Sequence, residues 1–197
     1  MAPIYGVLEL SEADRKRWEA KYAVGNPNPG FVPDPLLVQH ASFLDGQGWA
    51  LDIACGVGQN AMYLARRGYN VLAVDGSYNG LHYCRDALTG LDLKVHLVAA
   101  DLERFLLPLD RFQLVIVFRF LDRGLIAGLK QAVVPGGLLF YQTFNINRLN
   151  VSPQMTRSYL LEPGELARMF GDFDTIETND TSGNPSELSH WIGRRPK

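Results

Sequence analysis

The chain has 197 residues, enough for one domain with a full hydrophobic core. Hydrophobic residues make up 47% of it and charged residues 20%, which excludes a disordered or fibrous chain. The net charge of −2 provides no basic field for binding phosphates, so tight nucleic-acid binding is not expected.

The sequence also carries signals about the compartment. Residues 1–10 contain no basic segment followed by an apolar run, and no apolar run reaches the ~20 residues that span a bilayer. Two cysteines, Cys55 and Cys84, are too few for a disulfide framework. We therefore expect a cytoplasmic protein with no signal peptide and no membrane partner; the oligomeric state is left open.

Residues 1–45 are predicted to form helices that cover the core. Ser11–Asp14 resembles a helix-capping pattern, and the helix would run to about Ala23. Trp18 and Tyr22 lie four residues apart on one face of that helix. Two interpretations stay open: the aromatic pair packs on the core, or it forms a lid over a bound ligand.

A second N-terminal helix is predicted after Asp34 and Pro35, which form a cap followed by a favourable first position. Leu37, His40 and Leu44 then fall on one helical face. We interpret His40 as a partly exposed packing residue, because no acid is apparent that would orient it as a base.

The core, residues 46–197, begins with a strand, a glycine loop and a helix. Trp49–Ile53 predicts a short buried strand, and Asn60–Arg67 shows helical spacing of apolar residues. Between them Gly56 and Gly58 lack side chains that would keep a ligand away from the backbone. The helix start directs free N–H groups at whatever occupies the loop.

Two acids suggest which ligand the loop takes. Asn70–Val74 predicts a second strand ending in Asp75, placed ~20 residues after the loop as a ribose-binding acid would be. The letters from Gly56 to Ala61 also fit a dinucleotide fingerprint. Asp52 argues against that reading, because its carboxylate would repel a pyrophosphate. The same acid suits a cofactor with an ammonium and a cationic sulfur.

Further strands and helices alternate to the end of the chain. A helix is predicted over Ser77–Leu88 and a third strand over Lys94–Val98, followed by Asp101, which either contacts adenine or caps the next turn. Phe112–Val117 predicts a central fourth strand. The remaining predictions are a helix over 124–132, a Pro-Gly-Gly turn over 134–137 leading into a strand over 138–144, a polar connection over 145–161, a short helix over 163–170, and a hairpin of 175–178 with 188–192.

The segment after the fourth strand lies where an acceptor would meet the cofactor. Arg119 and Arg123 there either bind an anionic acceptor or form a solvated pair beside a helix start. The Asn/Asp-Pro-Pro-Tyr and Pro-Cys motifs used on nucleic-acid and amide acceptors are absent. Tyr141, on the fifth strand, is a further acceptor-side candidate.

Asp52–Asn60 and Ala73–Ser77 are similar to the first and second motifs of the class I S-adenosylmethionine-dependent methyltransferases. Within that superfamily the chain looks like the tellurite-resistance and thiopurine types, which begin with a helix carrying a Trp and a Tyr. It departs from the usual pattern at Ala54, where a glycine is usual. The resemblance implies an α/β, doubly wound, seven-stranded Rossmann-like sheet with a C-terminal antiparallel hairpin. The cofactor residues that the resemblance implies are Asp52, Ala54, Cys55, Gly56, Gly58, Asn60, Asp75, Gly76, Ser77, Asp101, Leu102 and Phe118.

These observations predict a single-domain enzyme that transfers a methyl group from S-adenosylmethionine to a small molecule such as a thiol or a metalloid anion. Trp18, Tyr22, Arg119, Arg123 and Tyr141 are the acceptor-side candidates, with no catalytic residue and no metal site assigned. A thiolate or oxyanion acceptor needs no general base. The alternatives are a non-catalytic cofactor-binding module, an RNA or protein methyltransferase, and a nicotinamide-dependent reductase, for which the Tyr-x-x-x-Lys signature is missing.

Overall fold

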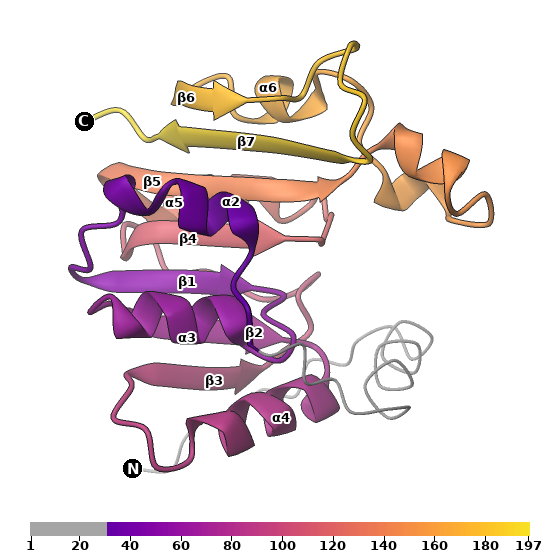
Figure 1. The fold of residues 1–197 in the computed structure, drawn as a ribbon. Helices are drawn as coiled ribbons and strands as arrows, with labels where there is room; N and C mark the ends of the chain where they lie inside the picture. The colour runs from indigo at the N-terminus through magenta and orange to yellow at the C-terminus, as the bar shows by residue number, and fades with distance from the viewer. Residues whose placement is uncertain (1–30) are drawn as a thin grey trace.

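The computed structural model describes residues 31–197. The predictions for Trp18, Tyr22 and the helix that contains them lie outside the described residues. The remaining chain forms one seven-stranded sheet with helices on both faces (Figure 1). The strands are β1 (Trp49–Ile53), β2 (Asn70–Asp75), β3 (Val95–Ala99), β4 (Phe112–Phe118), β5 (Val133–Phe144), β6 (Asp174–Thr178) and β7 (Leu188–Arg194).

The strand order is β3-β2-β1-β4-β5-β7-β6. Strands β1 to β5 pair in parallel, while β7 runs antiparallel to both of its neighbours, β5 and β6. The predicted doubly wound sheet with a C-terminal antiparallel hairpin is confirmed. The order reverses direction at β1, because β2 lies on one side of it and β4 on the other. In such sheets ligands bind beyond the carboxyl ends of the strands at this switch point.

Alternate residues along the strands point to opposite faces of the sheet and pack into two separate hydrophobic cores. Ala50, Val71 and Ile116 pack under the first helices of the chain, and Leu51, Val115 and Leu139 pack under the later ones. Figure 1 shows α2 and α3 on one side of the sheet. The helices are α2 (Pro35–Gln39), α3 (Gln59–Arg66) and α4 (Tyr78–Leu88) for the first core, and α5 (Ile126–Ala132) and α6 (Glu165–Met169) for the second.

Helix α2 begins as predicted and ends early. The Asp34 carboxylate accepts the Leu36 N–H at 3.0 Å, and Pro35 occupies the first turn, where it needs no donor. The helix stops at Gln39, and η1 (Ala41–Phe43), a 3-10 turn, carries the chain to Leu44. The single long helical face expected through residue 44 is therefore split, although Leu44 is buried as expected.

The Pro-Gly-Gly segment is part of a strand and not the turn that the sequence predicted. Strand β5 already begins at Val133, and its pairing with β4 shifts register between Phe112 and Leu114. A bulge of this kind tolerates the proline, which has no N–H to donate. Gly137 is required there, since a Cβ at this position would lie 2.8 Å from the Val133 side chain.

The C-terminal hairpin is held to the sheet by an aromatic cluster. Trp191 on β7 stacks on Phe170, just after α6, with ring centroids 4.7 Å apart. Such a pair contributes about 0.5–1.5 kcal/mol beyond its buried area. The expected polar connection after β5 contains two 3-10 turns, η2 (Ile146–Asn150) and η3 (Arg157–Tyr159).

Candidate active site

Three acids converge at the carboxyl edge of the sheet. Asp52 lies on β1 beside Ala73 of β2, and Asp75 at the end of β2 lies beside Ala99 of β3. Asp101 follows β3 by two residues. The register therefore sets the three carboxylates on three neighbouring strands next to the switch point between β1 and β4.

The loop between β1 and α3 is folded by left-handed residues. Ala54 has a φ of 58° and Gly58 a φ of 80°. Left-handed backbone costs an L-residue about 1–2 kcal/mol, so Ala54 holds local strain. Gly58 cannot be replaced without movement, because a Cβ there would lie 2.1 Å from the Sγ of Cys84 on α4.

Asp75 ties this loop to the start of α4. One of its carboxylate oxygens accepts the Gly56 N–H at 2.7 Å, and the other accepts the Ser77 N–H at 2.7 Å. Ser77 in turn caps α4 by accepting the Gly80 N–H. These two bonds orient the Asp75 carboxylate at the tip of β2.

Asp52 is the most unusual group at the edge. Its side chain is 1% exposed, and within residues 31–197 its Oδ2 has no hydrogen-bond partner. Burial raises the pKa of Asp52 well above its ordinary value, and the nearby charge of Asp75 raises it further. A buried acceptor without a donor is costly. A cationic donor would satisfy it, so the residues present fit a cofactor that carries an ammonium and a sulfonium.

Asp101 is also buried, and its Oδ1 accepts the Glu103 N–H at 3.1 Å. It thus caps the turn after β3, and this contact is compatible with a second role toward adenine. Leu102, on the turn after β3, is buried in the second core, and Phe118, at the end of β4, is buried in the first. The other predicted cofactor residues lie in the same two loops and their adjoining helix starts: Cys55, Asn60 and Gly76.

Arg119, immediately after β4, has a left-handed backbone with a φ of 56°. Its N–H donates to the Gln142 carbonyl at 2.7 Å, which fixes this conformation beside β5. Its guanidinium Nη2 lies 2.9 Å from Asp34 Oδ2, an ion pair whose acid is 2% exposed and whose arginine is 46% exposed. This distance makes Arg119 the partner of Oδ2.

Arg123 faces a different segment. Its guanidinium binds the Glu165 carboxylate through two contacts, at 2.6 and 3.1 Å, and donates to the Ser158 and Leu160 carbonyls. Arg119 and Arg123 are each nearly half exposed, and each has a specific carboxylate partner, Asp34 and Glu165 respectively. Arg123 fastens the connection before α6 to the segment after β4.

Tyr141, the remaining described acceptor-side candidate, is almost completely buried in the second core, near Phe170. Burial raises the pKa of its hydroxyl above the ordinary value, and the hydroxyl accepts from the Asp122 backbone. The structure thus surrounds Tyr141 with core side chains and does not bring it together with the three acids.

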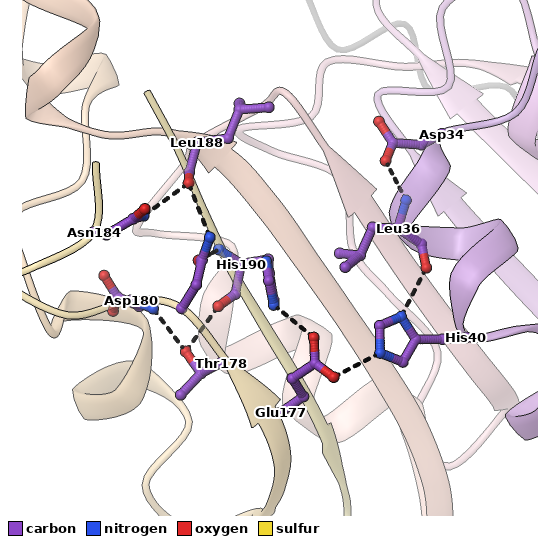
Figure 2. A network of polar contacts seen from close by, with 10 residues as sticks. Asp34, Leu36, His40, Glu177, Thr178, Asp180, Asn184, Leu188 and His190 are labelled. Atoms are coloured by element: carbon purple, nitrogen blue, oxygen red, sulfur yellow. Dashed lines mark hydrogen bonds and ion pairs between the residues drawn. The ribbon is translucent and has the colours of Figure 1, made fainter. Parts of the chain in front are cut away.

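Sequence reasoning missed a polar chain that runs from Asp34 across the sheet (Figure 2). The Leu36 carbonyl faces His40 Nδ1 at 2.9 Å, and His40 Nε2 lies 2.9 Å from Glu177 on β6. The other Glu177 oxygen lies 3.1 Å from His190 Nε2 on β7. An acid does therefore orient His40, contrary to expectation; it lies 137 residues away, so no local pattern indicates it.

Asp34 was also missed as part of the site. Its backbone N–H donates to Asn60 Oδ1 at 2.8 Å, which links the start of α2 to the first turn of α3. The sequence indicated only that Asp34 caps a helix. Its contacts with Arg119 and Asn60 form between segments that are distant in the sequence. Within residues 31–197 no group of three or more His, Cys, Asp or Glu residues is arranged to hold a metal ion.

Comparison with known proteins agrees with this geometry. Residues 50–137, from β1 to the start of β5, match a family described as a methyltransferase domain. A probable S-adenosyl-L-methionine-dependent methyltransferase, TehB of Haemophilus influenzae, is 24% identical over 140 residues, 68% of this chain and 48% of that protein. Hemagglutinin 1 of Eikenella corrodens is 27% identical over 139 residues, 68% of this chain and 46% of that protein. The chain spans about half the length of these curated relatives.

Solved structures share the fold. TehB of Haemophilus influenzae superposes with a TM-score of 0.67 at 17% identity, covering 92% of this chain and 66% of the other. A structure described as "Conversion of a Disulfide Bond into a Thioacetal Group during Echinomycin Biosynthesis" gives a TM-score of 0.70 at 20% identity, covering 92% and 91%. Magnesium protoporphyrin IX methyltransferase of Synechocystis PCC 6803, with bound S-adenosylhomocysteine, gives a TM-score of 0.65 at 16% identity, covering 93% of this chain and 94% of the other.

The sheet order and the acid-lined edge agree with the match of residues 50–137 to a methyltransferase domain, and together they support a domain that uses S-adenosylmethionine. TehB of Haemophilus influenzae is similar to this chain in both sequence and fold. The part of the chain that the structure describes contains no helix long and apolar enough to cross a bilayer.

Proposed function

We propose that this protein transfers a methyl group from S-adenosylmethionine to a small-molecule acceptor. One observation carries the proposal: the buried Oδ2 of Asp52 lacks a donor among the described residues, at a strand edge that also holds Asp75 and Asp101. A buried carboxylate oxygen without a donor among residues 31–197 favours a ligand that brings positive charge.

Different residues at this edge are suited to different parts of the cofactor. Asp52 is suited to the ammonium or the sulfonium, because its carboxylate is desolvated and its Oδ2 has no donor among the described residues. Asp75, oriented by Gly56 and Ser77, is suited to the ribose hydroxyls, and Asp101 with Leu102 to the adenine. The glycine loop lets the cofactor approach the backbone, and α3 directs its first N–H groups at it.

When bound, S-adenosylmethionine supplies an activated methyl group on a cationic sulfur. The protein then has to hold the acceptor in line with that bond and keep water away, tasks for which positioning is the main contribution. No described residue at the edge combines an exposed basic group with an orienting partner in the manner of a general base. An acceptor that reacts as a thiolate or an oxyanion agrees with that arrangement, since it needs none.

A small acceptor is favoured over a macromolecule by charge and by similarity. The chain has a net charge of −2, which gives no field for a nucleic acid. Two of the similar structures concern small molecules by their own descriptions: echinomycin biosynthesis and a magnesium protoporphyrin. These descriptions support a small-molecule acceptor without indicating which one.

The test is a thermal melt with three additions: S-adenosylhomocysteine, a nicotinamide dinucleotide, and buffer alone. We expect S-adenosylhomocysteine to raise the melting temperature in a dose-dependent way, and the dinucleotide to leave it unchanged. Turnover of methyl-labelled cofactor with thiols, metalloid anions and small amines then separates an enzyme from a binding module. A melting temperature that does not change when S-adenosylhomocysteine is added would reject the proposal.

A further inference from the structure

Arg119 occupies the place where an acceptor has to meet the cofactor. It follows the last residue of β4, on the strand next to β1 at the switch point. The Asp34 that holds its guanidinium also donates its backbone N–H to Asn60 in the first turn of α3. The guanidinium is therefore two polar contacts from the helix that opens at the cofactor loop.

The arginine is held in place before any ligand arrives. Its backbone is in the left-handed region and bonded to the Gln142 carbonyl, a conformation that persists only where the surroundings enforce it. Asp34 is itself fixed three ways: it caps α2, bonds Asn60, and lies on a helix whose other end is tied to β6 by His40 and Glu177 (Figure 2). A fixed guanidinium loses little freedom on binding a ligand.

Asp34 leaves most of this guanidinium unused. The contact with Asp34 involves Nη2, whereas a guanidinium has five N–H donors in a planar fork. Almost half of the side chain is exposed at the edge of the sheet. Arg123, by comparison, has its fork filled by Glu165 and two carbonyls. Of these two arginines after β4, Arg119 is the one whose side-chain donors, among the contacts within residues 31–197, are mostly left for a ligand.

We propose that Arg119 is a specificity-determining residue that binds an anionic group, a carboxylate or a phosphate, on an acceptor whose methylated atom is a separate nucleophile. The inference rests on the proposed function and adds the substrate class to it. The planar fork matches both anions, and charge-assisted bonds of this kind are the stronger ones. Asp34 acts through Arg119 as a positioning residue.

The test compares three thiols that share a nucleophile and differ in charge: 3-mercaptopropionate, 2-mercaptoethanol and cysteamine. In the reaction the thiolate sulfur forms a bond to the methyl carbon as the sulfonium–methyl bond breaks. The electron pair of that bond returns to the cofactor sulfur, and the thiol proton goes to solvent. We expect the highest kcat/KM for 3-mercaptopropionate, with inorganic phosphate competing against it.

Two substitutions then assign the preference to this arginine. Arg119→Gln and Arg119→Lys should each raise the KM for 3-mercaptopropionate about tenfold and leave that for 2-mercaptoethanol unchanged. Arg119→Lys keeps a charge for Asp34 and so guards against loss of the fold. Arg85→Gln, on an exposed face of α4, is the matched control and should change neither of these two KM values.

Failure of this inference is distinguishable from failure of the proposed function. If S-adenosylhomocysteine does not stabilise the wild-type protein, the proposed function itself is wrong. If S-adenosylhomocysteine does stabilise the protein, either of two results rejects the assignment of Arg119. One is equal kcat/KM or equal binding for the three thiols; the other is that no thiol further raises the melting temperature of the complex with S-adenosylhomocysteine. An equal loss of kcat for all three thiols in both variants would also reject it, since it would show a purely structural role.

Discussion

Glu177 joins two histidines from different parts of the chain, and its replacement by alanine probes how firmly α2 is held. The carboxylate is 48% exposed, whereas the side chains of His40 and His190 are only 11% and 13% exposed. Both bonds thus have one solvated and one largely buried partner. We take about 1 kcal/mol for each, between the value for a surface pair and that for a charged buried bond. Glu177→Ala should lower the free energy of unfolding at pH 7 by about 1–2 kcal/mol.

The pH dependence of this loss follows from the pKa shifts. The bond from His40 is the largest cause lowering the pKa of Glu177 below its ordinary value of 4.5. A lowered pKa means that the contribution is complete above 4.5 and is lost as the pH falls through the folded value. The difference between wild type and Glu177→Ala should therefore shrink below pH 4.5.

His190 adds to acid sensitivity in the same direction. Burial lowers its pKa below 6.5, so the folded protein favours the neutral ring. Protonation of the unfolded chain then lowers stability as the pH falls through 6.5.

Urea unfolding of wild type and Glu177→Ala from pH 3 to pH 8 measures the free energy of unfolding and its pH dependence. Glu103→Ala, at an exposed position on the turn after β3, is the control and should stay within about 0.5 kcal/mol of wild type. A loss below about 0.5 kcal/mol for Glu177→Ala at pH 7, or a loss that does not change toward pH 3, would show that the contacts of Figure 2 do not hold α2.

Three further substitutions test the site's construction by urea unfolding. Ala54→Gly should raise stability by about 0.5–1 kcal/mol, because relief of left-handed strain exceeds the entropy cost of glycine; a loss would contradict the strain. Gly58→Ala should cost about 2–5 kcal/mol, since its Cβ meets Cys84 at 2.1 Å, and a neutral result would refute the close approach. Arg119→Gln should cost about 1–3 kcal/mol by leaving the buried Asp34 carboxylate unpaired, which an unchanged midpoint would exclude.

Much of the sheet was predictable because its signals are local. Trp49–Ile53 and Asn70–Asp75 are short apolar runs bounded by turn residues, and each lies on a strand that the structure confirms. The acids at or near the carboxyl ends of β1, β2 and β3 were readable for the same reason: parallel strands bring their carboxyl ends to one edge. Their meeting at the switch point therefore followed from the order of elements.

The remaining contacts depend on distances that no sequence pattern records. His40 meets Glu177, and Asp34 meets Arg119, only after the sheet has formed. Pro135 and Gly136 have strong turn propensity, yet pairing with β4 draws them into β5 through a bulge. Tyr141 shows the same limit, since alternation along β5 decides that its ring faces the second core.

The central claim is that the buried carboxylate of Asp52 receives the positive charge of the cofactor. Calorimetric titration of S-adenosylhomocysteine, which keeps the ammonium, into wild type and Asp52→Asn tests it most directly. We predict binding to wild type and at least about tenfold weaker binding to the variant, with folding intact because asparagine removes a desolvated charge beside Asp75. Equal affinity for the two proteins would contradict the account.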